Sequence, residues 1–389
     1  MDRRLFLRMS CASGICSAIP RVAFANAATD SRMVFVILRG GLDGLHALAP
    51  YADPAYQRLR PRLALDKPGS EKGVLDLDGY FGLHPALAPM HALYQQGDLM
   101  LIPAATTRYR DRSHFDGQNL LENGSGIPFG ARDGWLNRAI ASLGSDRRLG
   151  LSFGPTLPLV MQGEAKIATW ADSPLPKPDE DFMFRLALMY QEDPTFAQTL
   201  EEANGSFSAM LAPEGRVKRG EEFERAAKTA AQLLARSDGP RIAVMDSRGW
   251  DTHFGQRWRL ATLLEELAAG VMELKNGLGA LWDQTTIIVV SEFGRTAAEN
   301  GSQGTDHGVG GLAMLLGGAV KGGRIGGDWP GLTGAALYEG RDVLPTTDYE
   351  SLFKAALIDR LGLSPGIVED HVFPSSRAIR PAEGLFHSV

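Results

Sequence analysis

Cysteine is almost absent from this chain of 389 residues, and both copies, Cys11 and Cys16, lie close to the N-terminus. A sequence pattern described below predicts that residues 1–27 are removed, so the remaining chain would contain no cysteine. A disulfide, a thiolate nucleophile and a cysteine metal ligand are therefore all excluded from it.

Two other features are missing. After residue 27 no run of about 18 apolar residues occurs, so we expect no stable insertion into a membrane. There is also no excess of positive charge. The whole chain has a formal charge of −6, and residues 1–27 carry four arginines and one aspartate, which leaves −9 on the rest. A chain this acidic is a poor candidate for non-specific binding to nucleic acid or to anionic lipid.

The N-terminus has the pattern of a twin-arginine signal peptide. Arg3 and Arg4 stand one residue before Phe6-Leu7, a moderately apolar run follows over residues 9–20, and small residues over 23–27 suit a signal peptidase. We expect the twin-arginine translocase to export the folded chain, and we expect the mature protein to be periplasmic or secreted.

Apolar runs alternate with helical patterns after the signal segment. A heptad-like leucine stripe over 260–281 and a shorter apolar stripe over 223–234 have helical spacing. Continuous apolar runs typical of buried parallel strands are Met33–Leu38, Leu99–Pro103, Ile242–Asp246, Thr286–Ser291 and Leu312–Leu316. This alternation predicts an α/β fold, with a doubly wound, mostly parallel sheet covered by helices on both faces.

We expect residues 28–389 to form a single domain. Within it, residues 149–181 contain short β-like pieces followed by a proline-rich stretch over 173–181. We interpret this segment as an insertion or cap with a connector, and not as an independent domain.

Polar segments follow four of the predicted strands, at the ends where ligands of open α/β sheets usually bind, and a fifth, 304–308, directly precedes the strand Leu312–Leu316. The segments are 40–44 with Asp43, 112–116 with Ser113 and His114, 249–253 with Asp251 and His253, 291–296 with Glu292 and Arg295, and 304–308 with Asp306 and His307. Taken singly, each has a structural explanation as a turn residue, a helix cap or an ordinary ion pair. Together they place carboxylates and imidazoles at one sheet edge, where they would repel without a cation, and such mixtures bind divalent metals.

At these residues the sequence resembles the exported family called domain of unknown function 1501, which is itself similar to the alkaline phosphatase and sulfatase superfamily. The resemblance covers about residues 33–373. It rests on the motifs RGGLDGL near residue 42, RSHFDGQ near 115, GWDTH near 251, SEFGRT near 293 and GTDHG near 306, in that order.

The resemblance implies an alkaline-phosphatase-like fold and one or two divalent ions, which would be zinc, calcium, magnesium or manganese. It implies that Asp43, Asp251, His253, Glu292 and His307 are metal ligands. We expect Asp306, next to His307, to be a metal ligand as well. It further implies that Asp43, Asp251, Glu292 and His307 approach within a few ångströms of one another. Phe293 stands where the superfamily usually has a ligand histidine.

The resemblance also implies that Ser113 is the nucleophile of an ester hydrolase, and that Arg295 or Arg112 holds an oxygen of the ester. Ser113 has the competing role of helix cap, and His114 is a ligand, an acid or simply a helix N-terminal residue. The expected substrates are small-molecule or glycan esters of phosphate or sulfate. The alternative function is a non-catalytic, metal-containing binding or scaffold protein of the cell envelope. A mutase fits poorly with export.

Overall fold

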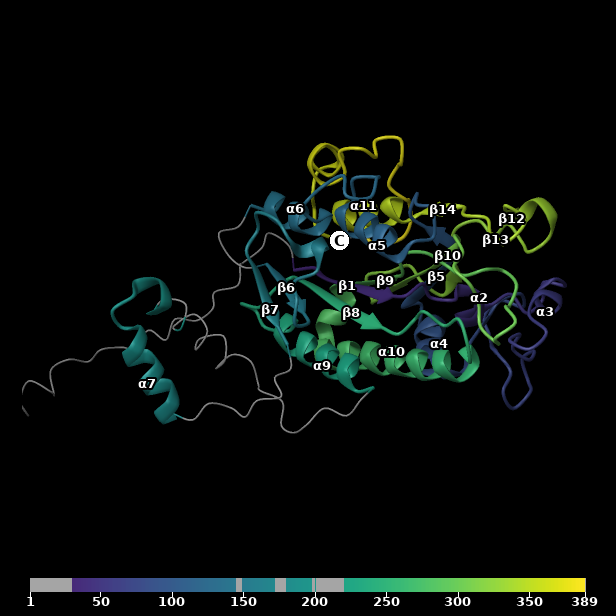
Figure 1. Ribbon diagram of the computed structural model, residues 1–389, viewed down its shortest axis with the longest axis horizontal. Coiled ribbons are helices and arrows are strands. Elements are labelled where there is room, and N and C mark those ends of the chain that lie inside the picture. Colours follow the sequence, from purple (N-terminus) through teal and green to yellow (C-terminus); the bar gives the residue numbers. More distant parts are fainter. Residues whose placement is uncertain (1–29, 145–148, 172–179, 198–199, 201–219, 389) are drawn as a thin grey trace, which may run out of the picture. The chain divides into compact units, whose positions relative to one another are not determined.

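The computed structural model describes residues 30–144, 149–171, 180–197, 200 and 220–388 (Figure 1). The predicted signal peptide and most of the proline-rich stretch lie outside these residues. Helix α7 (Glu180–Tyr190) belongs, with its described neighbours up to residue 200, to a compact unit of its own. All other described residues belong to the main unit.

A nine-stranded sheet organises the main unit. Its order is β11 (Arg324–Ile325), β5 (Leu99–Thr106), β10 (Gly311–Leu316), β9 (Thr285–Val290), β1 (Arg32–Arg39), β8 (Ile242–Arg248), β6 (Gly150–Phe153) and β7 (Ile167–Trp170), with β14 (Thr347–Asp348) also paired to β5. Only β10 runs antiparallel to its neighbours. All five strands predicted from apolar runs are present, so the predicted fold class is confirmed.

Helices cover both faces of this sheet (Figure 1). On one face lie α4 (Ala88–Gln96), α9 (Glu222–Leu234) and α10 (Gln256–Leu278), and on the other lie α5 (His114–Asn123), α6 (Trp135–Ser142) and α11 (Tyr349–Asp359). The two predicted leucine and alanine stripes form α10 and α9, as expected from their spacing. Within the described residues, no helix is both long enough and apolar enough to cross a membrane.

Shorter elements complete the main unit. They are α2 (Gly44–Ala47), β2 (Leu48–Ala49), α3 (Tyr56–Leu59), β3 (Leu75–Asp76), β4 (Gly82–Leu83), η1 (Pro85–Leu87), η2 (Leu159–Met161), η3 (Gly279–Gln284), η4 (Gly334–Ala336), β12 (Leu337–Tyr338), β13 (Asp342–Val343), α12 (Pro365–Ile367) and η5 (Val368–Val372). Strands β2, β4 and β3 form a small antiparallel sheet, and β12 pairs with β13.

The segment 149–181 differs from its prediction as an insertion. Its first part supplies β6 and β7, which pair in parallel and extend the central sheet beyond β8. The strands are only four residues long and lie at the edge of the sheet. Such short runs give little apolar signal, and this explains why the sequence did not identify them as part of the sheet.

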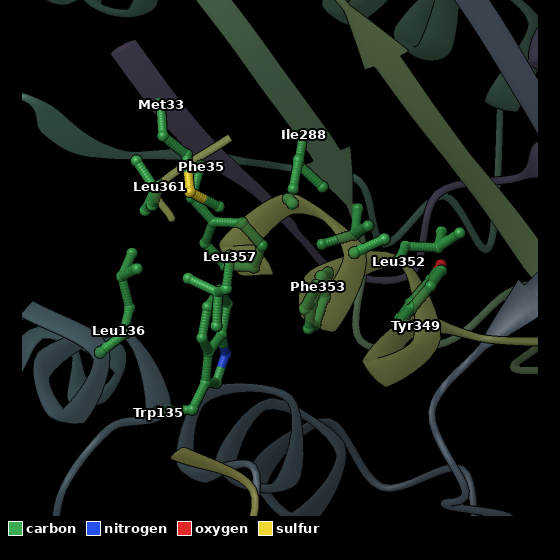
Figure 2. Close-up of a cluster of buried hydrophobic side chains, with 14 of the residues drawn as sticks. Met33, Phe35, Trp135, Leu136, Ile288, Tyr349, Leu352, Phe353, Leu357 and Leu361 are labelled. Atoms are coloured by element: carbon green, nitrogen blue, oxygen red, sulfur yellow. The ribbon is translucent and has the colours of Figure 1, made fainter. Parts of the chain in front are cut away.

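The core on one face packs β1 against α6 and α11 (Figure 2). Phe35 meets the rings of Trp135 and Phe353 edge-on, at centroid distances of 5.2 and 5.3 Å. Trp135 and Phe353 stack on each other at 4.8 Å. Alternate residues of β1 point to the opposite face, where Val34 and Val36 are also fully buried. Burial on both faces holds the strands firmly, so the loops that leave their carboxyl ends start from fixed points.

Candidate metal centre

Five segments far apart in the sequence meet at the carboxyl edge of the sheet. Strands β8, β1 and β9 are parallel neighbours, so the loops that follow them leave from the same edge. Because β10 is antiparallel, the segment that precedes it, with His307, reaches the same edge. The N-terminus of α5, with His114, completes the group.

Three imidazoles converge there through their Nε2 atoms. His307 Nε2 lies 2.9 Å from His114 Nε2 and 2.9 Å from His253 Nε2. Asp251 Oδ1 lies 3.6, 3.0 and 3.3 Å from the Nε2 atoms of His114, His253 and His307. The ligand atoms of His114, Asp251 and His307 all fall within 4.8 Å of one another. A single ion placed among the ligand atoms of these three residues could reach all three, whereas His253 is not part of this group.

The other ring nitrogen of each histidine faces an acceptor. His114 Nδ1 lies 2.7 Å from Glu292 Oε1, His307 Nδ1 lies 3.0 Å from the carbonyl oxygen of Arg112, and His253 Nδ1 lies 3.3 Å from Asp306 Oδ1. These partners can only accept while the carboxyl groups are ionised, so each Nδ1 carries a proton. In the neutral form the Nε2 lone pair of His307 then faces those of His114 and His253, and such lone pairs repel unless a cation lies between them.

Two side chains stay in the forms that metal binding needs. Burial disfavours the ionised form of Asp251, but the hydrogen bond and charge of Arg295 outweigh it, so the pKa of Asp251 lies below its usual value. Burial, together with the charges of His114 and Arg295, lowers the pKa of His307, which favours the neutral imidazole. A carboxylate and a neutral imidazole are the metal-binding forms.

Glu292 contacts the Nδ1 atom of His114, on the side of the ring away from the Nε2 atom that faces the cluster. Its side chain is fully buried, and its carboxylate accepts hydrogen bonds from His114 Nδ1, Gln118 Nε2 at 2.8 Å and the backbone amide of Gly40 at 2.9 Å. Burial alone would raise the pKa of Glu292, but the bonds from His114 and Gln118 keep it below the usual value. Glu292 therefore orients His114 and does not face the other ligand atoms.

Asp43 is not part of the cluster. It is fully buried, and its carboxylate binds Arg60 Nη1 at 2.7 and 2.9 Å and Gln256 Nε2 at 2.6 Å, while it also caps α2. Among the described contacts, none joins Asp43 to the three imidazoles or to Asp251. The structure therefore places Asp43 outside the cluster, in an ion pair with Arg60 that neutralises its charge.

Arg295 is also buried and holds the loops of the site together. Its guanidinium donates to the carbonyl oxygens of Gly40, Gly41 and Thr305, and it binds Asp251 Oδ1 at 2.5 Å. The expected contact with a substrate oxygen does not fit, since these donors are used inside the protein. Arg112, the alternative, is paired with Asp342 and Glu339.

The backbone beside the cluster is tightly packed. A side chain at Gly40, whose φ is +125°, would place its Cβ 2.5 Å from the backbone nitrogen of Asp251. Arg112 has a φ of +61°, which is uncommon for a residue other than glycine, and its carbonyl oxygen is the one that faces His307. Phe293 is buried and packs on the rings of His114 and His307, at 4.8 and 5.2 Å. Phe293 thus covers one side of these two imidazoles with an apolar ring.

The remaining predicted residues lie at the border of the cluster. Ser113 is the N-cap residue of α5, but its side chain makes no capping hydrogen bond. Asp306 lies on the outer side of His253 and also binds Asn300, so it supports a histidine and does not point at the other ligand atoms.

A cavity of about 430 Å³ adjoins the cluster, and His114 and Asp251 form part of its wall. The other lining residues are Arg39, Gly40, Gln118, Thr156, Pro158, Asp246 and Arg248. Arg39 and Gln118 were overlooked at the level of sequence, although both belong to the motifs that carry the resemblance. Arg248 ends β8 directly before the GWDTH motif, and its place at a strand end was the available signal.

Comparison with known proteins gives a family without an assigned activity. The family model described as "Protein of unknown function (DUF1501)" matches residues 179–372. No curated protein matches the sequence.

Several solved structures are similar over most of the chain. The structure of Ps i-CgsB with a neocarrahexaose is 13% identical, with 74% of this chain and 65% of that chain covered and a TM-score of 0.38. A Vibrio parahaemolyticus protein of the alkaline phosphatase superfamily is 11% identical, with 85% and 72% covered and a TM-score of 0.40. The phosphonate monoester hydrolase of Agrobacterium radiobacter is 12% identical, with 86% of this chain and 74% of that chain covered and a TM-score of 0.34. The chain thus spans less than two thirds of the first of these, and likenesses at this level assign it no substrate.

Proposed function

Because this chain belongs to the DUF1501 family, whose description names no activity, its function has to be inferred from the site, and we propose a metal-dependent hydrolase of phosphate or sulfate esters. The observation that carries the proposal is the convergence of three imidazole Nε2 atoms on Asp251 Oδ1, with every Nδ1 held by an acceptor. Histidines whose second nitrogen is fixed in this way are typical of metal ligands.

A mixture of imidazole nitrogens and a carboxylate oxygen suits zinc or a divalent first-row transition metal. His114, His307 and Asp251 would hold it, through two nitrogens and one oxygen, and His253 Nε2 lies beside them, 2.9 Å from His307 Nε2 and 3.0 Å from Asp251 Oδ1. Zinc takes such ligands readily, whereas calcium and magnesium prefer sites made of oxygen atoms, so zinc is the ion we favour. When bound, such an ion withdraws charge from an ester oxygen and lowers the pKa of a hydroxyl or water beside it.

The protein's own residues would keep this arrangement fixed. Glu292 holds the ring of His114, and Arg295 keeps Asp251 ionised and in place. Phe293 keeps water away from one side of the imidazoles. Ser113 remains the proposed nucleophile: it precedes His114, and its hydroxyl is not used to cap α5. Its Oγ would attack phosphorus or sulfur, the alcohol would leave, and water would then cleave the seryl ester.

The test is metal content followed by hydrolysis. Protein purified without its signal peptide should contain about one divalent ion per chain and should hydrolyse nitrophenyl phosphate, bis-nitrophenyl phosphate or nitrophenyl sulfate. His307→Ala should lose both the metal and the activity. Metal without hydrolysis of any ester would reject the enzyme and favour the binding or scaffold protein. Absence of metal from the unaltered protein would reject both.

We also propose that the protein reaches the periplasm or the exterior through the twin-arginine translocase. The proposed ligands come from residues 114, 251 and 307, which meet only in the folded chain. A protein that binds its metal in this way before export needs a route that carries folded cargo.

A further inference from the structure

The cavity beside the cluster is larger than an ester group needs. About 430 Å³ lies within the range of pockets that bind small organic ligands, and His114 and Asp251 connect it to the candidate metal centre. A substrate whose ester group lies at the imidazoles would therefore extend along the remaining wall, toward the ends of β1 and β8.

Two arginines stand side by side on that wall. Arg39 and Arg248 are register partners on the parallel strands β1 and β8, so they leave the sheet on the same face at neighbouring positions. Arg39 is neutralised inside the protein. Its guanidinium binds Asp246 at 2.8 and 3.2 Å, Glu122 at 2.7 Å and Gln118 at 3.1 Å.

Arg248 is different. It lines the same cavity and is exposed, and within the part of the chain that the structure describes it makes no hydrogen bond or ion pair. A guanidinium group presents a planar pair of donors that matches a carboxylate, sulfate or phosphate. The guanidinium of Arg39 already donates to Asp246, Glu122 and Gln118, so Arg248 is the arginine of this cavity wall whose donors are available to a ligand.

We propose that Arg248 binds a second anionic group of the substrate, so that the preferred substrates carry an acidic group in addition to the ester that is cleaved. This inference rests on the proposed function, since the ester group is assigned to the imidazole cluster. The ligand chemistry is an oxyanion, and carboxylate, sulfate and phosphate share it. An acidic sugar ester would have such a pair of groups.

Equilibrium binding of two matched probes tests this without turnover. Phenylphosphonate carries one acidic group, and 4-carboxyphenylphosphonate carries a carboxylate as well. Calorimetric titration of the metal-loaded mature protein should give about tenfold tighter binding for the carboxylated probe, as expected for a charge-assisted hydrogen bond. Arg248→Gln should abolish this difference and leave the affinity for phenylphosphonate unchanged, while Arg248→Lys should keep part of it.

The control is Arg380→Gln, which removes the same charge from an exposed arginine that does not line the cavity. It should preserve the tenfold preference. Equal affinity of the unaltered protein for the two probes would overturn the inference and leave the proposed function standing. A preference that survives Arg248→Gln would overturn it as well. If neither probe binds to protein with normal metal content, the proposed function fails and the inference fails with it.

Discussion

Replacing Glu292 with glutamine should weaken metal binding although residue 292 is not among the proposed ligands. The carboxylate now accepts hydrogen bonds from His114, Gln118 and the amide of Gly40. A glutamine keeps the shape, but one of its two terminal positions is an NH₂ group, which would face a donor. His114 would then lose its fixed tautomer and orientation.

The magnitude follows from what such partners contribute to metal sites. Loss of a partner behind a ligating histidine costs about 10- to 100-fold in affinity, which is roughly 1.4–2.7 kcal/mol. The effect on stability can be stated too. Metal at a hundred times its Kd stabilises the fold by about 2.7 kcal/mol, and the same concentration would give only about 0.4–1.4 kcal/mol to Glu292→Gln.

Competition with a chelating indicator measures the affinity, and thermal unfolding with and without zinc measures the stabilisation. Glu350→Gln is the matched control, because Glu350 is also a buried carboxylate that binds Arg108, away from the cluster. It should leave zinc affinity unchanged. Equal zinc affinity in Glu292→Gln and the unaltered protein, within about twofold, would refute the role given to Glu292.

Three further predictions concern other parts of the chain. Replacing Arg3 and Arg4 together with lysine should leave the precursor in the cytoplasm, and normal amounts of mature protein in a periplasmic fraction would contradict this. Ser113→Ala loses no capping bond and only a side-chain hydrogen bond with Tyr109, so it should cost at most about 1 kcal/mol of stability, yet reduce ester hydrolysis by orders of magnitude; unchanged hydrolysis would assign the attack to water. Burial lowers the pKa of His46 from 6.5 to about 3, so the stability that its neutral form provides is present above pH 6.5 and is lost as the pH falls toward 3. Between pH 7 and pH 5 the unaltered protein should lose about 2 kcal/mol more than His46→Leu in urea unfolding, and parallel pH profiles would refute this.

The sequence was sufficient for the five long strands of the sheet and for the edge at which polar residues gather. Long apolar runs such as Met33–Leu38 have an unmistakable composition, and the turn residues after them mark where each strand ends. Strands β6 and β7 were missed because four residues at a sheet edge carry too little pattern.

The roles within the site were harder to predict. Asp43 and Glu292 both follow central strands and have the right chemistry for a ligand. What decides their roles is the tertiary position of other side chains: Arg60 neutralises Asp43, and His114 stands between Glu292 and the other imidazoles. His114 had three open interpretations for the same reason, since nothing in its local sequence says which strand end α5 will face.

The buried guanidinium of Arg295 has a consequence for recognising related proteins. Its charge lies in the interior with Asp251 as its ionic partner, and removing that partner would leave the cation uncompensated. A relative that had lost its metal would still need an aspartate at this position to fold. An aspartate at the position of Asp251 in another sequence therefore does not show that the protein binds a metal. The histidines at positions 253 and 307 are the better marker, because no fully buried charge in the described structure is paired with them, whereas His114 binds the buried carboxylate of Glu292.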